Sequence, residues 1–284
     1  MSPSTKDALL IALLRACAVA AAAVVVLIVA FVARDSWPAL RDIGIVRFLS
    51  DDWSPTGADP GFGIMPMLVA TLVTSAGAIT LATPLGIASA VFAHFYAPRG
   101  LAVLLRRVME LLAGIPSVVY GLWGLVVLVP LLLRFAPPGQ SVLAGTLVLT
   151  VMILPTVALM ADVALAAVPA PTLQAAHALA LPRHAIALKV AVPAARSGIV
   201  TGIVLAAGRA VGETMAVLMV CGNVVKLPTS VFDPVRTLTA NIALEMGYAL
   251  ADHRAALFVS GLCLLLMWMA LASTAGLVRG GRHA

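Results

Sequence analysis

Two charged side chains interrupt a long apolar stretch in the last third of the chain. The segment GRAVGETMAV, residues 208–217, holds Arg209 and Glu213 four positions apart, with Thr214 directly after them. Charged side chains inside a membrane span are costly and usually face the interior of a helix bundle or a water-filled cavity. Residues i and i+4 share one face of a helix, so we expect Arg209 and Glu213 to pair. One interpretation is therefore a neutralised buried pair that locks two helices together.

A second interpretation gives the same two residues a ligand. The planar guanidinium of Arg209 is a fixed fork of donors that suits the oxygens of a tetrahedral oxyanion. Glu213 would hold Arg209 while no ion is bound, which limits the affinity and lets the ion leave. Thr214 and Thr201 are weaker candidate donors. The residues alone leave both interpretations open.

The segment LAGIPSVVYGLWGL, residues 112–125, also carries polar groups in an apolar run. Gly114, Pro116 and Gly121 permit a broken or tightly packed helix, and Ser117 and Tyr120 bring hydroxyl groups to the depth of a helix bundle. Helix packing explains such groups more often than ligand binding does. Ser117 is nevertheless a candidate for the same path as Arg209.

The composition indicates where these segments lie. The chain has 284 residues, of which 62% are hydrophobic and 11% charged, which is typical of an integral membrane protein. About 20 helical residues cross the apolar core of a bilayer. We therefore expect an all-α membrane protein with six transmembrane helices, at residues 16–33, 64–93, 111–133, 142–161, 197–220 and 255–278.

The first apolar run differs from a cleaved secretory signal. It is longer than a normal signal core, and residues 31–34 provide no clear small-residue cleavage site. We interpret it as an uncleaved first span. Cys17, Cys221 and Cys263 are scattered through apolar segments, so we expect no disulfide framework and no metal site.

The basic residues indicate an orientation. With six spans both termini lie on one side, and if that side is the cytoplasm it receives ten basic residues, Arg106 and Arg107 among them, against seven outside. The positive-inside rule favours this arrangement. The net charge of +6 is then a topology signal and predicts no nucleic-acid partner. The outer loops, residues 34–63 and 222–254, are long enough to need a partner, although a folded-back cap explains them equally well.

The inner stretch QAAHALALPRHAIALKVAVPAARSG, residues 174–198, lies between the fourth and fifth spans. Pro182 and Pro193 divide it into short helical pieces, and Arg183, His184 and Lys189 keep it at the water boundary. Periodicity alone favours an amphipathic connector that rests on the membrane surface.

The same stretch resembles the EAA loop of permease subunits of ATP-binding-cassette (ABC) importers. Gln174, Ala175 and Ala176 fall on the Glu-Ala-Ala positions, Ala180 on the glycine, and Pro193 on the final proline. The chain departs from that pattern at Gln174, which replaces the acid, and at Ala180, which replaces the glycine that shapes the turn. The resemblance implies a short helix that docks in a groove of a cytoplasmic ATPase subunit.

Several segments together resemble the permeases of the phosphate-specific uptake system, and the similarity covers about residues 48 to 270. The segments are LAGIPSVVYGLWGL, FGIMP (62–66), VPAPTLQAA (168–176), ARSGIVTGIVLAAGRAVGETMAVLMVCGN (195–223) and NIALEMGY (241–248). GETMAV and NIALEMGY are closer to the PstC subunit than to its partner PstA. The resemblance implies a type I ABC importer permease core of the MetI-like kind and places Arg209 and Glu213 in the phosphate path.

This resemblance divides the chain into regions. Residues 1–33 form a cytoplasmic tail and the first span, 34–63 an extracytoplasmic loop, 64–278 a five-helix permease core with the EAA-type loop at 174–193, and 279–284 a cytoplasmic tail. The implied partners are a PstA-like second permease, two PstB-like ATPase subunits that bind ATP and Mg, and a PstS-like extracytoplasmic phosphate-binding protein. No cofactor is expected on this chain, whose implied location is the bacterial inner membrane, with membrane lipid around it.

Other functions compete with this one. Arg209 does not separate phosphate from phosphonate, sulfate or molybdate. A transporter or channel driven by an ion gradient would need no ATP and leaves residues 174–193 unexplained. An enzyme is disfavoured because the chain has neither HExxH nor GxSxG, and it lacks the phosphate loop GxxxxGK[ST] of an ATPase.

Overall fold

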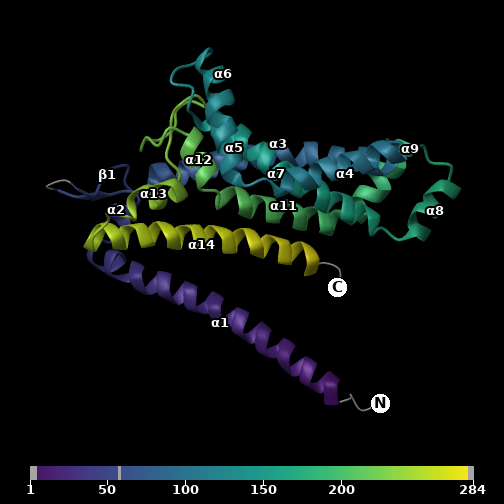
Figure 1. Cartoon of the computed structure of the whole chain (residues 1–284), viewed down its shortest axis with the longest axis horizontal. Coiled ribbons are helices and arrows are strands. Elements are labelled where there is room, and N and C mark those ends of the chain that lie inside the picture. The colour runs from purple at the N-terminus through teal and green to yellow at the C-terminus, as the bar shows by residue number, and fades with distance from the viewer. Residues whose placement is uncertain (1–4, 57–58, 281–284) are drawn as a thin grey trace.

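The computed structural model describes residues 5–56 and 59–280 and confirms the expected all-α architecture (Figure 1). Four helices are long and apolar enough to cross a membrane, and two bent helix pairs bring the number to as many as six. The four are α1 (Thr5–Asp42), α3 (Met65–Val91), α7 (Val142–Ala166) and α14 (Ala251–Gly280).

The two remaining candidate spans are bent. The first consists of α4 (Arg99–Gly114) followed by α5 (Ser117–Trp123), the π-helical segment η2 (Gly124–Leu128) and α6 (Val129–Leu133), with a bend of 94°. The second consists of α9 (Arg183–Ala185), η3 (Ile186–Ala191) and α10 (Val192–Ala194), followed at 70° by α11 (Arg196–Val211).

A proline explains the first bend. Ile115 is extended, with φ −68° and ψ 130°, because the ring of Pro116 disfavours helical geometry in the residue before it. The predicted third span, residues 111–133, therefore does not form one straight helix, since its first residues belong to a separate helix that begins at Arg99. Arg106 and Arg107, which we expected in an inner loop, lie within this helix.

Short elements connect the long helices. The strands β1 (Trp53–Ser54) and β2 (Gly61–Phe62) pair antiparallel, with Trp53 opposite Phe62. The others are α2 (Ile45–Phe48), η1 (Phe92–Tyr96), α8 (Ala170–Ala178), α12 (Met215–Val220) and α13 (Leu238–Glu245).

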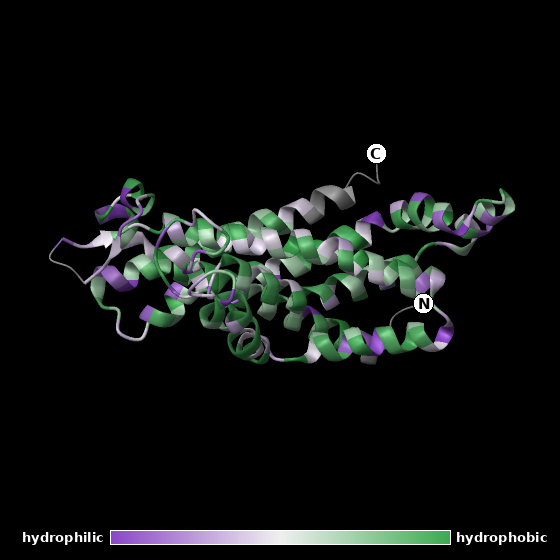
Figure 2. Cartoon of the chain, turned by 90° about the horizontal axis from the view of Figure 1, so that it is seen from above, coloured by the Kyte–Doolittle hydropathy of each residue, from purple (hydrophilic) through white to green (hydrophobic). Residues whose placement is uncertain are grey.

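The helices form one bundle with two distinct ends. In Figure 1 the β1–β2 hairpin, α2 and α13 lie at one end, which we call the hairpin end, and α8 and α9 lie at the other, the α8 end. The first turns of α1 and the last turns of α14 point toward the α8 end. Figure 2 shows hydrophobic residues along the middle of the bundle and hydrophilic ones concentrated toward its ends. This distribution suits a protein that spans a bilayer.

The core lies around α7, whose Leu149, Met152 and Ile153 are fully buried. Helix α3 approaches α7 closely, because a Cβ atom on Gly86 would lie only 2.8 Å from Cγ1 of Val157. Small residues at such contacts let helix backbones pack tightly in a membrane. By contrast, the apolar window of α1 is unburied within this chain, as expected of a helix that faces lipid or another subunit.

Helix α1 is longer than predicted. The predicted span ended at residue 33, whereas the helix continues to Asp42. Its last turns pack against the bundle, because Ser36 and Ala39 are buried. The Ser36 hydroxyl donates to the Val32 carbonyl of the same helix at 2.6 Å. The charges from Arg34 onward therefore mark a change of environment along the helix, and the helix itself does not end there.

Candidate functional site: a helix break at residues 212–214

The helix that carries Arg209 ends before it reaches Glu213. Helix α11 stops at Val211, and α12 begins at Met215. Between them, the Gly212 amide still donates to the Gly208 carbonyl at 3.1 Å, and the Glu213 amide to the Ala210 carbonyl at 3.3 Å. We call residues 212–214 the helix break. Irregular backbone of this kind occurs at membrane depth only where protein buries it or where it borders a cavity.

Glu213 is buried beside this break, with 9% of its surface exposed. Its carboxylate oxygen Oε1 accepts a hydrogen bond from the backbone amide of Ala216 at 3.1 Å. The Glu213 backbone carbonyl accepts one from the Thr239 hydroxyl at 2.7 Å. Glu213 therefore caps the first turn of α12, where a carboxylate is favoured by the helix dipole.

Arg209 lies in the last turn of α11 and is half-buried. Among the ion pairs of the described residues there is none between Arg209 and Glu213. The expected pair therefore does not form, because the i and i+4 positions share a face only along a continuous helix, and this one ends between them. Arg209 complements the negative C-terminal end of α11, as Glu213 complements the positive end of α12.

Helix α5 brings the second predicted segment to the same region. The Tyr120 hydroxyl of α5 donates to the Leu112 carbonyl at 2.7 Å. A Cβ atom on Gly121 would lie 2.9 Å from Cα of Ala216, so α5 packs directly on α12. The expectation that LAGIPSVVYGLWGL forms a broken and tightly packed helix is thus confirmed.

The other candidate donors differ in their surroundings. Ser117 is half-buried at the start of α5, one turn before Tyr120. Thr214 lies within the break, and its hydroxyl is 3.4 Å from the Gly212 carbonyl. Thr201 donates to the Ser197 carbonyl at 2.8 Å, two turns before Arg209 on α11. The structure therefore gathers Arg209, Glu213 and Thr214 at the break, with α5 alongside.

A cavity of about 370 Å³ lies next to the end of α11. Its lining comes from α3, α14 and Val211, and it is almost entirely apolar. Ser75 is the polar exception on α3, since it is 3% exposed and its Oγ atom has no hydrogen-bond partner in the structure. The cavity reaches α11 at Val211, the residue directly before the break.

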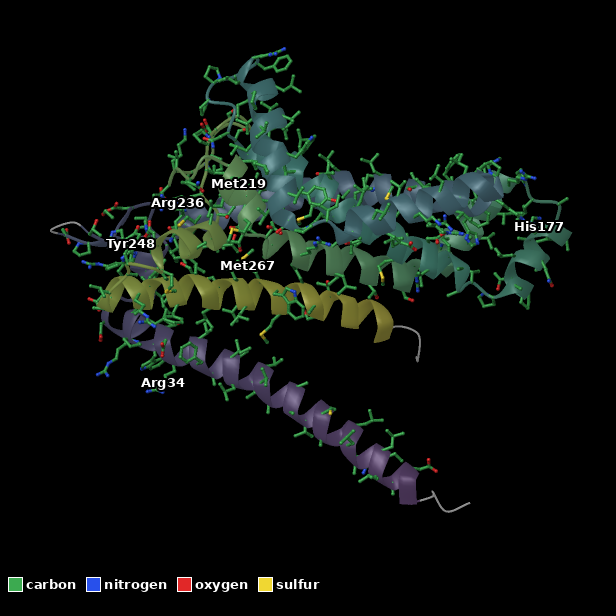
Figure 3. The ribbon with its side chains drawn as sticks, viewed as in Figure 1. Arg34, His177, Met219, Arg236, Tyr248 and Met267 are labelled. Atoms are coloured by element: carbon green, nitrogen blue, oxygen red, sulfur yellow. The ribbon has the colours of Figure 1, made fainter. Side chains whose placement is uncertain are left out.

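The hairpin end holds a polar cluster that the sequence did not predict. Glu245, which is 7% exposed, accepts hydrogen bonds from Trp53 Nε1 at 2.9 Å and Arg236 Nη1 at 2.6 Å. His253 Nε2 lies 2.8 Å from the same carboxylate. Arg236 also donates to Asn241 Oδ1 at 3.0 Å. We call Trp53, Arg236, Asn241, Glu245 and His253 the Glu245 cluster, and Figure 3 shows Arg236 and Tyr248 at this end. NIALEMGY was the only signal for it, and that segment carried no assigned role.

A second unpredicted ion pair joins α4 to α7. Arg106 donates through Nε and Nη2 to the two carboxylate oxygens of Asp162, at 2.7 and 3.0 Å. His94 Nδ1 lies 3.8 Å from Asp162 Oδ1. The two-pronged geometry fixes the relative position of the two helices and explains how Arg106 is accommodated within α4.

The predicted docking loop carries a short helix, α8, that extends away from the bundle, and Figure 3 shows His177 at its far end. Gln174, Ala175 and Pro193 are exposed, whereas Ala176 is only 4% exposed. Ala176 therefore packs within its own chain, and the outward surface of α8 is formed by neighbours such as Gln174 and Ala175.

The turn after α8 explains the glycine of the EAA pattern. Ala180 has φ of +51°, in the left-handed region that favours glycine. Its amide donates to the His177 carbonyl at 2.9 Å, and the Leu181 amide donates to the Ala176 carbonyl at 3.3 Å. These two bonds form a Schellman motif, which ends a helix with a left-handed residue. Alanine therefore occupies the turn at some conformational cost, and the turn forms without glycine.

Comparison with known proteins decides the family. Residues 82–278 match the family described as the binding-protein-dependent transport system inner membrane component. The chain belongs to this family. It is 41% identical over 233 residues to the probable ABC transporter permease protein YqgH of Bacillus subtilis, covering 80% of this chain and 75% of YqgH. It is 36% identical over 254 residues to the phosphate transport system permease protein PstC of Mesorhizobium japonicum, covering 82% and 77%.

Solved structures agree with the fold. A chain of the inward-facing MetNI methionine ABC transporter superposes with a TM-score of 0.57 at 20% identity, covering 76% of this chain and 94% of that one. An amino acid ABC transporter gives a TM-score of 0.55 at 18% identity, covering 75% and 90%. The expected MetI-like fold is therefore confirmed, and the chain is a multi-pass permease component of an ABC transport system.

Proposed function

We propose that this chain is the PstC-like permease subunit of an ATP-driven importer of inorganic phosphate. Its path would lie between this chain and a second, PstA-like permease subunit. An extracytoplasmic, PstS-like phosphate-binding protein would deliver the ion. Two PstB-like ATPase subunits would bind ATP and Mg and drive the alternation between outward-facing and inward-facing states.

Arg209 is the observation that carries this proposal. It is a permanent cation inside a membrane bundle at a helix break, and no ion pair with it occurs in the described part of the chain. A guanidinium in this position attracts an oxyanion, since a partly desolvated cation without a carboxylate partner is stabilised by an arriving anion. Glu213, Thr214 and Ser117 would border the path and keep the affinity low enough for release.

The similarity to PstC of Mesorhizobium japonicum supports phosphate as the ion. Helix interruptions at the site fit a path in which the ion passes irregular backbone. We infer from the basic residues that both termini and the α8 end face the cytoplasm and that the hairpin end faces outward. In this orientation the binding protein would dock near β1–β2, and the ATPase near α8.

Uptake of radiolabelled phosphate into proteoliposomes tests the proposal. The vesicles contain this chain, its candidate permease partner, the ATPase and the binding protein, with or without ATP on the ATPase side. We expect strictly ATP-dependent uptake that arsenate inhibits by competition and sulfate does not. Competition by sulfate or molybdate would indicate another oxyanion, and uptake by this chain alone under an ion gradient would overturn the importer.

A matched pair of substitutions on α8 tests the ATPase contact. Ala175 is exposed and Ala176 is buried, one position apart on the same helix. Ala175→Leu should reduce co-purification of the ATPase and uncouple ATP hydrolysis from uptake, while the chain remains folded. Ala176→Leu should instead lower the thermal stability of the chain itself, because the larger side chain has no room. Unchanged coupling in Ala175→Leu would count against docking at this face.

A further inference from the structure

Helix α13 connects Glu213 and Glu245, the two buried carboxylates among the described residues. Its first turn carries Thr239, whose hydroxyl donates to the Glu213 carbonyl at 2.7 Å. Its last residue is Glu245, the centre of the cluster at the hairpin end. Glu245 lies six positions after Thr239, a distance along the helix axis of about 9 Å. One short helix therefore reaches from the helix break to the hairpin.

The hairpin side of α13 is held by Trp53. The Trp53 indole donates to Glu245 Oε2 from β1, 192 positions away in the chain. The Trp53 ring also contacts His253 and Phe62 edge to face, at centroid distances of 5.9 and 6.3 Å. A displacement of the hairpin therefore changes the position of Glu245, because this buried carboxylate cannot easily replace its donors with water.

The break side of α13 is held by hydroxyl groups. Thr239 is 7% exposed, and its bond to Glu213 reaches the backbone of the break directly. The Thr237 hydroxyl accepts from the Ala240 amide at 3.2 Å and caps the helix. Thr71 of α3 accepts from the Leu238 amide at 3.0 Å. The first turn of α13 is therefore capped and is fixed both to α3 and to the backbone of the break.

We propose that α13 transmits the position of the β1–β2 hairpin to residues 212–214, with Trp53 and Thr239 as positioning residues at its two ends. The role in transport rests on the proposed function: a binding protein that docks on the hairpin shifts Trp53 and Glu245, and α13 carries this shift to the backbone beside Arg209. Neither Trp53 nor Thr239 contacts the ion. Both act through the geometry of the break.

The test uses two conservative variants of the full complex, each with a matched control. Trp53→Phe keeps an aromatic ring and loses the indole N–H, and Trp37→Phe makes the same change on exposed α1. Thr239→Val keeps the shape and loses the hydroxyl. Thr229→Val makes the same change at a hydroxyl that donates to Asp233 in the neighbouring loop. The measurement is ATP hydrolysis with and without the phosphate-loaded binding protein.

Trp53→Phe and Thr239→Val should each lower the ratio of stimulated to unstimulated hydrolysis by about fivefold, the factor that one net hydrogen bond contributes to a two-state equilibrium. Unstimulated hydrolysis and the KM for ATP should not change, and the two controls should keep the wild-type ratio. Wild-type stimulation in both Trp53→Phe and Thr239→Val would overturn the proposal.

A second measurement does not depend on transport. Hydrogen exchange of the backbone amides at residues 212–217 is followed in the complex in lipid nanodiscs. Trp53→Phe should accelerate exchange there as Thr239→Val does, although Trp53 lies at the opposite end of α13. Normal exchange in Trp53→Phe would refute transmission through α13. Failure of the wild-type complex to import phosphate would refute the proposed function and leave this result standing.

Discussion

The chain contains two couples of arginine and glutamate, of which one forms an ion pair and the other does not. Arg209 and Glu213 are four positions apart and do not pair, whereas Arg236 and Glu245 are nine positions apart and form a buried ion pair at 2.6 Å. Glu245 is also bound by Trp53. Glu213 is bound through its carboxylate only by the Ala216 amide, as far as the described residues show.

The difference indicates that Arg236 and Glu245 serve the fold, whereas Arg209 is available to a ligand. In the Glu245 cluster, donors from three segments of the chain surround one carboxylate, so the charge of Arg236 is neutralised where it stands. At the helix break, Glu213 is bound by a backbone amide, and no described carboxylate forms an ion pair with Arg209. Removing one partner of a buried pair leaves an uncompensated charge and destabilises the fold, whereas a cation without a carboxylate partner in a membrane bundle is better suited to a passing anion.

The largest expected effect is on transport. Arg209→Gln should reduce phosphate uptake by about 100-fold, because two charge-assisted hydrogen bonds to the ion are lost, and the complex should assemble in normal amounts. Arg236→Gln should have the reverse pattern, with less assembled complex and a near-normal rate for each complex that forms. Both quantities are measured by uptake normalised to the purified complex. Loss of assembly in Arg209→Gln would make Arg209 a structural residue.

The next effect is on stability. Glu245→Gln removes the charge from a cluster that also holds Arg236 and His253, and it should lower the free energy of unfolding by about 3 kcal/mol. Glu213→Gln should change it by less than about 0.5 kcal/mol, since the amide oxygen of glutamine still accepts from Ala216. SDS titration of the micelle-bound chain measures both variants. Equal losses would show that the two carboxylates serve the same purpose.

The sequence predicted the membrane class and the family and singled out Arg209, Glu213 and Thr214, but its prediction that Arg209 pairs with Glu213 was wrong. Apolar runs of suitable length and the motifs around residues 208–217 depend on local composition, which a single sequence contains. The pairing of Arg209 with Glu213 assumed a continuous helix. Gly212 lies between them, and glycine is a weak helix former that permits the chain to leave the helix there.

The Glu245 cluster could not be predicted because its contacts are distant in sequence. Trp53 lies in a hairpin, Glu245 ends α13 and His253 belongs to α14, so only the folded bundle brings them together. The 94° bend was easier to predict from the sequence, since Pro116 and the glycines around it indicated an interrupted helix. What they did not indicate was that Arg106 would find Asp162 on α7.

A smaller effect on stability distinguishes the hydrogen bond that Glu213 accepts from the charge that it carries. Glu213→Ala removes the acceptor for the Ala216 amide and should lower the free energy of unfolding by about 1 kcal/mol, the usual cost of a lost N-terminal cap. Glu213→Gln keeps the acceptor and serves as the control. SDS titration should therefore order the variants as wild type, Glu213→Gln, Glu213→Ala. If the two variants are equally unstable, the charge itself stabilises the break, and the contrast with Glu245 weakens.

The smallest effect concerns a third carboxylate, Asp233, in the loop between α12 and α13. The Thr229 backbone amide and hydroxyl, the Ser230 amide and the Lys226 ammonium hold the pKa of Asp233 well below its ordinary range. A carboxyl whose pKa is depressed in the folded state stabilises that state above the unfolded pKa of about 3.9, and the contribution disappears as the pH falls toward the folded value.

Amide protection at Thr229 and Ser230, corrected for the intrinsic exchange rate, should therefore stay constant from pH 7 to pH 5. Asp233→Asn should lose part of this protection already at pH 7, because the charged acceptor for both amides is gone. A fall in wild-type protection between pH 7 and pH 5 would contradict this account. Such a fall would show that the loop responds to a titratable group other than Asp233.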